Sequence, residues 1–314
     1  MGEVVRYIIH KKAMEKKAIV GDSTIHKRFL DSHVPLLQEF PALQSLADKM
    51  WGAALDCYNE PLDHAPIGEE LEKSTALRLA QIIVFYLARA SFDCFYDIFL
   101  LAGNGRGFAA KMMLRPMYEH LVTATFIAIK PGEAKHFDDH ASVEKWKMWI
   151  RTLEAVPQTG GLVPTEDVEE LKKKQQEVRD QLKSEICKKC GTPKTQEAWT
   201  RVALDNMAEE VDKVTGTSLS KLYAPCYLMP TALTHPTALG LESRLTRVPG
   251  VQTYEEMPEE LAHDALLRGH GMALRVLKHV NSYFGLGFDA EVQSRYEAFP
   301  TIWGGALADP PAEA

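Results

Sequence analysis

The hexapeptide Arg115-Pro116-Met117-Tyr118-Glu119-His120 places ionisable side chains inside an otherwise apolar segment. An unpaired buried charge costs several kcal/mol, so such side chains must find partners. A guanidinium binds carboxylates and phosphates, whereas a carboxylate or an imidazole exchanges protons. The segment therefore predicts a polar site within a helical core, formed either by a binding pocket or by structural ion pairs.

Arg115 and Glu119 have the i, i+4 spacing that allows two side chains to pair on one face of a helix. A polar stripe is also expected on residues 76–101, where steps of three, four and seven residues return to one face. Its members are Tyr86, Arg89, Asp93, Tyr96 and Asp97. We expect Arg89 and Asp93 to join the Arg115 site as residues that bind a small anionic ligand.

A second polar group follows about a hundred residues later, where Tyr223, Tyr227, Thr231 and His235 advance in steps of four. These side chains share one face if a helix survives the nearby prolines. If Pro230 breaks the helix, His235 lies at a loop end, where its imidazole can titrate. We expect Tyr223 and Tyr227 to bind the ligand, and His235 to act with Arg115 and Glu119 in any catalysis. A capping or core histidine is the alternative for His235.

The residues of these two polar groups resemble those of a known protein family. The run from Leu77 to Phe126, with Arg115-x2-Tyr118-Glu119 at its centre, and the later Tyr223-x3-Tyr227-x7-His235 resemble a bacterial helical family, domain of unknown function 5677. The resemblance covers residues 70–285 and implies an all-α fold without implying a reaction. Pro116 stands where the family has a small polar residue, and a kink there would reorient Arg115.

Arg115-x4-His120 also resembles the Arg-x(4 to 6)-His pattern of the HEPN ribonucleases of toxin and defence systems. That resemblance implies metal-independent RNA cleavage, with His120 as general acid and base and Arg115 stabilising the phosphate charge. Five residues of a straight helix turn by about 500°, which places the two side chains about 140° apart. A kink at Pro116 or a second copy of the chain is therefore required.

Three further motifs have simpler interpretations. His136-x3-His140 has the spacing of paired metal ligands but no evident third ligand, so a solvated helix face is expected. Cys187-x2-Cys190 lacks the second pair of a zinc knuckle, which favours a turn at a hairpin tip. The glycine-rich loop 103–108 lacks the residues of a nucleotide-binding loop and is interpreted as a turn between helices. We assign no metal and predict no cofactor.

The composition is that of a globular protein, with 46% hydrophobic and 25% charged residues and a net charge of −7. The acidic balance argues against general nucleic-acid binding. Five scattered cysteines and the absence of an apolar signal segment near the N-terminus predict a reduced, cytoplasmic location. Residues 79–101 are apolar, but Arg89, Asp93 and Asp97 would be costly at bilayer depth, so a buried helix rather than a membrane span is expected.

Helical periodicity dominates, and the chain is predicted to be all-α, a multi-helix bundle with a projecting helical hairpin. The expected helices cover residues 34–58 (a helix pair or one helix kinked at Pro41), 70–101, 107–129, 133–155, 165–186, 195–214, 217–242 (interrupted by Pro225, Pro230 and Pro236) and 256–284. Residues 1–164 and 215–300 are expected to form one core domain, 165–214 the hairpin, and 301–314 a loose tail. The narrow apolar stripe of the hairpin predicts a homodimer.

Three functions are compatible with these features. The favoured one is a cytoplasmic protein with a buried pocket of Arg, Glu, Asp, Tyr and His side chains for a small anionic ligand, with the reaction unassigned. The alternative is a HEPN-like ribonuclease, for which RNA would be a partner. A structural or scaffolding protein is the third, and its charges would be paired off with no cavity beside them.

Overall fold

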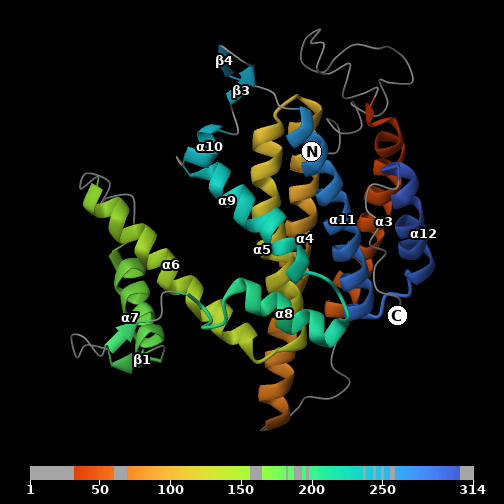
Figure 1. Cartoon of the computed structure of the whole chain (residues 1–314). Coiled ribbons are helices and arrows are strands. Elements are labelled where there is room, and N and C mark those ends of the chain that lie inside the picture. The colour runs from red at the N-terminus through yellow and green to blue at the C-terminus, as the bar shows by residue number, and fades with distance from the viewer. Residues whose placement is uncertain are drawn as a thin grey trace. The chain divides into compact units, whose positions relative to one another are not determined.

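The computed structural model of the chain describes residues 32–59, 69–155, 165–181, 183–186, 193–195, 198–235, 238–242, 245–248, 251–254 and 259–304. Helices dominate these residues (Figure 1), which confirms the prediction of an all-α bundle. Two short antiparallel strand pairs are additions that the sequence did not indicate. No helix among the described residues has the length and apolar character required to cross a membrane.

The chain divides into two compact units. The first consists of Met1–Asp63, Val84–Ile129 and Leu204–Ala314, and the second of His64–Ile83 and Lys130–Ala203. The division falls within the continuous helix α4 (Glu69–Gly103), whose second part belongs to the first unit. The described candidate site residues all belong to the first unit.

Helix α5 (Gly107–Ile129) is largely buried and lies at the centre of the first unit. It packs against α11 (Glu259–Phe284), α8 (Leu204–Thr215) and α9 (Met229–Thr234). Its apolar side chains cover most of its circumference, so it can be contacted on several sides at once. The helix is continuous through Pro116 and spans the predicted residues.

Helix α4 also matches its predicted range, and it reaches α5 through a tight turn. Gly105 in that turn has a φ of 69°, and the Asn104 side-chain amide donates to the Leu100 carbonyl at 2.7 Å. Glycine adopts positive φ without a steric penalty. The glycine-rich loop is therefore a turn between helices, as its sequence indicated.

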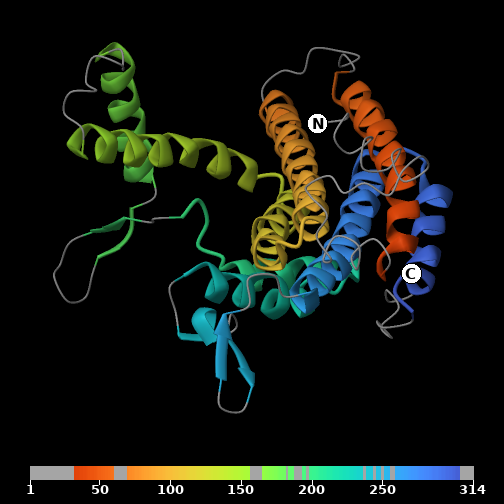
Figure 2. The same cartoon turned by 90° about the horizontal axis from the view of Figure 1, so that it is seen from above.

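Helices α3 (Val34–Asn59) and α12 (Asp289–Ile302) pack on α11 and on each other (Figure 2). Arg295 of α12 donates to both carboxylate oxygens of Glu39 at 3.0 Å. Helix α3 is one helix through Pro41, so it is not a helix pair. The prediction from the sequence did not include α12.

The second unit contains α6 (Glu133–Ala155), α7 (Thr165–Gln181) and the strand pair β1 (Lys183–Ile186) and β2 (Pro193–Thr195). The described residues of 165–214 do not form the expected hairpin of two helices. Helix α7 packs on α6, its stripe residue Val178 is buried, and the next helix, α8, begins only at Leu204. Cys187 and Cys190 lie outside the described residues.

The chain between α9 and α11 contains α10 (Ala238–Glu242) and the antiparallel strands β3 (Leu245–Val248) and β4 (Val251–Tyr254). Val248 pairs with Val251 at the end of this strand pair. The tail expected at 301–314 begins as helix, because α12 extends to Ile302 and the next residue, Trp303, is buried. Residues 305–314 lie outside the described part.

Candidate functional site

The segment that packs across α5 consists of three successive helical pieces. They are the 3-10 turn η2 (Ser220–Leu222), the π-helical turn η3 (Ala224–Leu228) and α9. Pro225 and Pro230 each stand in the first turn of a piece, where the missing N–H is not needed. The prolines therefore change the type of helix without ending the segment. π-Helical turns occur frequently at functional sites.

Asp212 fixes the start of this segment. Its carboxylate accepts hydrogen bonds from the backbone N–H groups of Leu219 at 2.7 Å and Ser220 at 2.9 Å. The hydroxyls of Ser220 and Thr217 add two more, at 2.6 and 2.8 Å. Hydrogen bonds to an ionised acceptor are about twice as strong as neutral ones. Asp212 thus positions the residues that follow, although it was not among the residues predicted from the sequence.

Three tyrosines meet where this segment crosses α5. The rings of Tyr223 and Tyr227 stack at 5.1 Å with an angle of 18° between their planes. The Tyr118 ring of α5 lies 6.3 and 6.5 Å from them, and its hydroxyl donates to the Leu219 carbonyl at 3.0 Å. Burial raises the pKa of Tyr118 and, together with Asp205, that of Tyr223. Both phenols are therefore hydrogen-bond donors at neutral pH.

Arg115 joins this aromatic group from α5. Its Nε donates to Glu119 Oε1 at 3.1 Å, and its guanidinium lies over the Tyr227 ring, 5.0 Å from the centroid. The Arg115 side chain is 30% exposed and that of Glu119 37%. Among the described residues, nothing accepts a hydrogen bond from the two Nη atoms of Arg115. The Arg115 guanidinium therefore has donors that make no hydrogen bond to the described residues, on a partly exposed side chain.

His235 lies at the C-terminal end of α9. Its backbone is extended (φ −87°, ψ 151°), its N–H donates to the Thr231 carbonyl at 3.2 Å, and its side chain is exposed. The Thr231 hydroxyl bonds back to the Tyr227 carbonyl at 2.6 Å. The imidazole is therefore accessible, but no contact among the described residues joins it to Arg115 or Glu119.

The structure does not bring Arg89 and Asp93 to this group. Both are exposed on α4. Burial raises the pKa of the Asp93 carboxyl, Arg89 opposes that shift, and Asp97 and Asp48 of α3 reinforce it. The polar stripe of α4 therefore belongs to a separate acidic cluster that α4 forms with α3.

His120 lies away from Arg115, as the geometry of a continuous helix requires. Its Nδ1 atom is buried and has no hydrogen-bond partner within the described part of the chain. Burial lowers the pKa of the imidazole, and Glu119 only partly opposes this effect. No contact between Arg115 and His120 is found in the described first unit.

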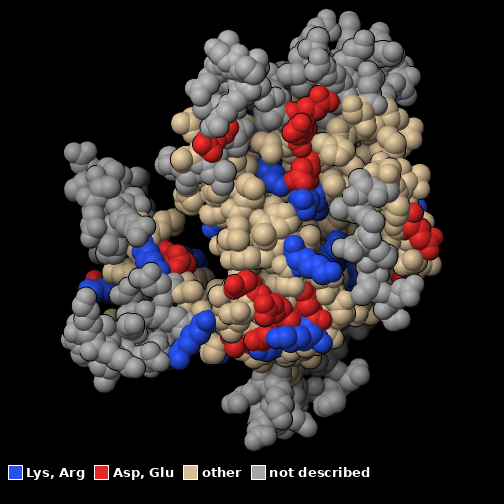
Figure 3. All heavy atoms as spheres, in the orientation of Figure 1, with Lys and Arg blue, Asp and Glu red and all other residues tan. Residues whose placement is uncertain are grey.

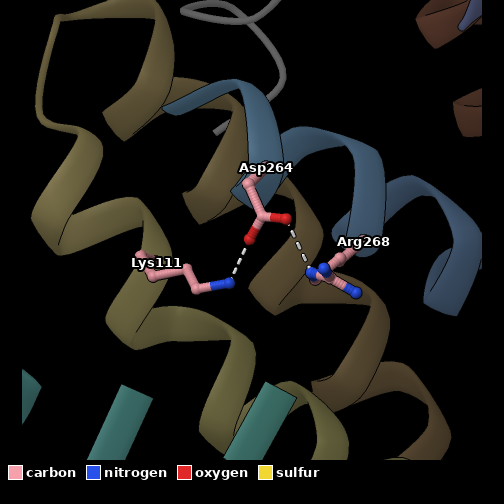
Figure 4. Close-up of polar contacts among 3 residues, drawn as sticks. All are labelled: Lys111, Asp264 and Arg268. Atoms are coloured by element: carbon pink, nitrogen blue, oxygen red, sulfur yellow. Dashed lines mark hydrogen bonds and ion pairs between the residues drawn. The ribbon is translucent and has the colours of Figure 1, made fainter. Parts of the chain in front are cut away.

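Sequence reasoning missed a charged group beside the same π-helical turn. The ammonium of Lys111 on α5 pairs with Asp264 Oδ2 of α11, and Asp264 Oδ1 accepts from Arg268 Nε at 2.7 Å (Figure 4). Only 3% of Lys111 is exposed. Burial raises the pKa of the neighbouring Cys226 thiol to about 11, so the thiol is neutral and a poor nucleophile. In the sequence, Lys111 is a lysine among apolar residues, and this feature could have indicated the charged group.

The histidines with metal-like spacing face carboxylates. His136 Nδ1 lies 3.3 Å from Glu133 Oε2, and His140 Nε2 lies 3.7 Å from Glu144 Oε1. No cluster of three or more potential metal ligands is found in the residues that the structure describes. His136 is exposed, as the helix-surface interpretation expects, whereas His140 is buried, so that interpretation does not hold for the second histidine.

On the face shown in Figure 3, Lys and Arg side chains are interspersed with Asp and Glu. The two kinds lie next to each other over α8 and along α11. The described residues of this face therefore form no broad basic surface of the kind that tracks a nucleic-acid backbone.

The sequence of the chain matches a known protein family. A family of unknown function (DUF5677) matches residues 81–250, which include the Arg115 group and the segment from Tyr223 to His235. No curated protein and no solved structure matches the chain. The match covers more than half of the 314 residues and confirms the resemblance found in the sequence. The chain belongs to the DUF5677 family.

Proposed function

We propose that Arg115, Glu119, Tyr223 and Tyr227 form a binding site for a small anionic ligand. The observation that carries the proposal is the Arg115 side chain, which is held by Glu119 and Tyr227 and is 30% exposed. Arginine presents two parallel donors to carboxylates and phosphates. No reaction is assigned to the site.

The Arg115–Glu119 pair is weak enough for a ligand to compete with it. Exposed i, i+4 ion pairs contribute about 0.3–0.5 kcal/mol, whereas a hydrogen bond to a charged group contributes about 1.5–3 kcal/mol. Glu119 balances the charge of Arg115 in the free protein, and an anion would share or replace that partner. Glu119 thus orients the guanidinium and also limits the affinity of the site.

Aromatic stacking supports the proposal from the other side of the guanidinium. A cation over a tyrosine ring gains about 0.5–1 kcal/mol at an exposed position, which holds the plane of the Arg115 side chain. The stacked Tyr223 ring carries a protonated hydroxyl that can donate to the same anion. The ligand would therefore contact the charged guanidinium of Arg115 and the neutral hydroxyl of Tyr223.

The Arg115–His120 ribonuclease alternative has less support. In one chain the two residues lie on different sides of α5, and the imidazole has a lowered pKa and a buried Nδ1. A general acid and base requires access to substrate and a pKa near the working pH. Incubation of the purified protein with total RNA, wild type against His120→Ala, separates the functions: cleavage lost in the variant would support the nuclease. The cytoplasmic location and the homodimer stay predictions.

Titration with inorganic phosphate and with benzoate tests the proposed site, because these probes are a simple oxyanion and an aromatic carboxylate. Arg115→Gln keeps a polar side chain of similar size but removes the charge. We expect at least about tenfold weaker binding in this variant, the equivalent of about 1.4 kcal/mol. Arg295→Gln is the matched control, since Arg295 pairs with Glu39 between α12 and α3.

A further inference from the structure

The Arg115–Glu119 pair offers a ligand two opposite charges on one face of α5. Glu119 Oε1 accepts from Arg115 Nε at 3.1 Å, which leaves the two Nη atoms of Arg115 and the Oε2 atom of Glu119. Within the described part of the chain, these remaining atoms take part in no hydrogen bond or ion pair. Both side chains are partly exposed. The pair therefore keeps cationic donors and an anionic acceptor side by side.

A second acceptor lies on the same face of α5. Met112, Pro116 and Glu119 follow one another in steps of four and three residues, and each is partly exposed on a helix that is largely buried. Proline has no N–H, so Pro116 cannot donate to the Met112 carbonyl as any other residue at that position would. The Met112 oxygen can therefore accept a hydrogen bond from a ligand.

We infer that the ligand of the Arg115 site is a small zwitterion, with a carboxylate and an ammonium close together as in a free α-amino acid. The inference rests on the proposed function and narrows its ligand class. The carboxylate would bind the Nη atoms of Arg115 as a bidentate pair. The ammonium has three donors, and it would donate to Glu119 Oε2 and to the Met112 carbonyl.

The charge of the pair favours a zwitterion over a simple anion. Arg115 and Glu119 sum to zero, so an anion that is attracted by the guanidinium is repelled by the carboxylate beside it. An anion also competes with Glu119 for Arg115. A zwitterion instead meets an opposite charge at both of its ends and leaves the ion pair intact.

Apolar side chains near the pair indicate the kind of amino acid to test. Leu228 and Met229, which directly follow Tyr227, are 48% and 45% exposed. Exposed apolar side chains that gather beside polar groups are typical of ligand-binding surfaces. An amino acid with a large apolar side chain, such as L-phenylalanine, is therefore the appropriate probe.

Calorimetric titration of the full chain with three compounds tests the inference. All three carry a phenyl ring on a two-carbon chain. L-Phenylalanine has both charged groups, 3-phenylpropionate has only the carboxylate, and phenethylamine has only the ammonium. We expect the wild type to bind L-phenylalanine at least about tenfold more tightly than either of the other two compounds.

Glu119→Gln should remove this preference. Glutamine keeps an oxygen that can accept from Arg115 Nε but lacks the negative charge that binds the ammonium. The ratio of the affinities for L-phenylalanine and 3-phenylpropionate should therefore fall at least about tenfold. Arg115→Gln should weaken the binding of both compounds. Glu297→Gln, at an exposed carboxylate of α12, is the matched control and should leave the ratio unchanged. Circular dichroism spectra equal to that of the wild type would show that the variants fold.

The inference is overturned if 3-phenylpropionate or phenethylamine binds the wild type as tightly as L-phenylalanine does, or if Glu119→Gln keeps the wild-type ratio. Equal binding of L-phenylalanine and 3-phenylpropionate that is weakened in Arg115→Gln would reject the zwitterion but leave the proposed anion site standing. Absence of binding by all three compounds also overturns the inference. The proposed site itself would fail only if phosphate and benzoate did not bind either.

Discussion

The hydroxyl of Tyr118 donates to the carbonyl of Leu219 at 3.0 Å, and this bond ties α5 to the start of the segment that carries Tyr223 and Tyr227. Tyr118 is fully buried, and Leu219 is 2% exposed. The bond therefore joins two halves of the candidate site that are a hundred residues apart in the sequence.

Tyr118→Phe should lower the free energy of unfolding by about 0.5–1.5 kcal/mol, because the buried Leu219 carbonyl would lose its side-chain donor but keep the Leu222 N–H. The aromatic packing of the ring would be retained. Urea denaturation measures the change. Tyr86→Phe is the control, since that tyrosine is 60% exposed and should shift stability by less than about 0.5 kcal/mol. Equal effects of the two substitutions would contradict the role given to Tyr118.

Asp212→Ala should destabilise the protein by about 2 kcal/mol, because two backbone N–H groups and two hydroxyls lose a charged acceptor. Amide hydrogen exchange should show the loss at residues 217–228 first. Glu209→Ala on the exposed side of the same helix should leave exchange in that segment unchanged. Protection retained in Asp212→Ala would show that Asp212 does not position the segment.

Substitutions of Lys111 and Asp264 should have strongly non-additive effects on the free energy of unfolding. Asp264→Ala leaves a buried ammonium without its partner, and we expect about 2–3 kcal/mol of destabilisation. This is less than for a fully buried pair, because the Asp264 side chain is 30% exposed. Lys111→Met in the same background should recover much of the loss. Additive effects in the double-mutant cycle would contradict a direct pair.

Stability should fall in acid through His270. The Trp303 indole donates to His270 Nδ1 at 3.0 Å, and burial lowers the pKa of the imidazole to about 3 from an unfolded value of 6.5. Below pH 6.5 the unfolded chain binds a proton that the folded chain does not. This group therefore contributes stability that is complete above pH 6.5 and is lost as pH falls toward 3, by up to about 1.4 kcal/mol per pH unit.

Denaturation from pH 7 to pH 4 checks this dependence. His270→Phe should reduce the slope of stability against pH in that window, whereas substitution of the exposed His136 should not. His279 contributes in the same direction, since burial lowers the pKa of its imidazole to about 4. A slope unchanged in His270→Phe would assign the acid sensitivity to other groups.

The sequence predicted the features that depend on local spacing. The ranges of α4 and α5, the Arg115–Glu119 pair and the shared face of Tyr223 and Tyr227 all follow from steps of three or four residues along a helix. The same reasoning left open whether the prolines near Tyr227 end the helix. The segment stays helical because Pro225 and Pro230 fall where a helical piece begins and no donor is required.

Other features depend on contacts that no local pattern contains. Lys111 meets Asp264 across 153 residues, and His33 meets His263 across 230. Such pairs follow from the packing of α5 and α3 against α11, which hydrophobic periodicity does not specify. Arg89 shares a sequence neighbourhood with the site residues, but the charge that it acts on is Asp93 of its own helix. The polar residues were therefore easier to identify than their partners.

Calorimetric titration with inorganic phosphate and benzoate, for wild type, Arg115→Gln, Glu119→Gln and Arg295→Gln, measures whether Arg115 binds the anion. We expect binding by the wild type, at least about tenfold weaker binding by Arg115→Gln, unchanged binding by Arg295→Gln, and tighter binding by Glu119→Gln, because the anion no longer competes with a carboxylate. Absence of binding by the wild type, or equal affinities for wild type and Arg115→Gln, would contradict anion binding by Arg115.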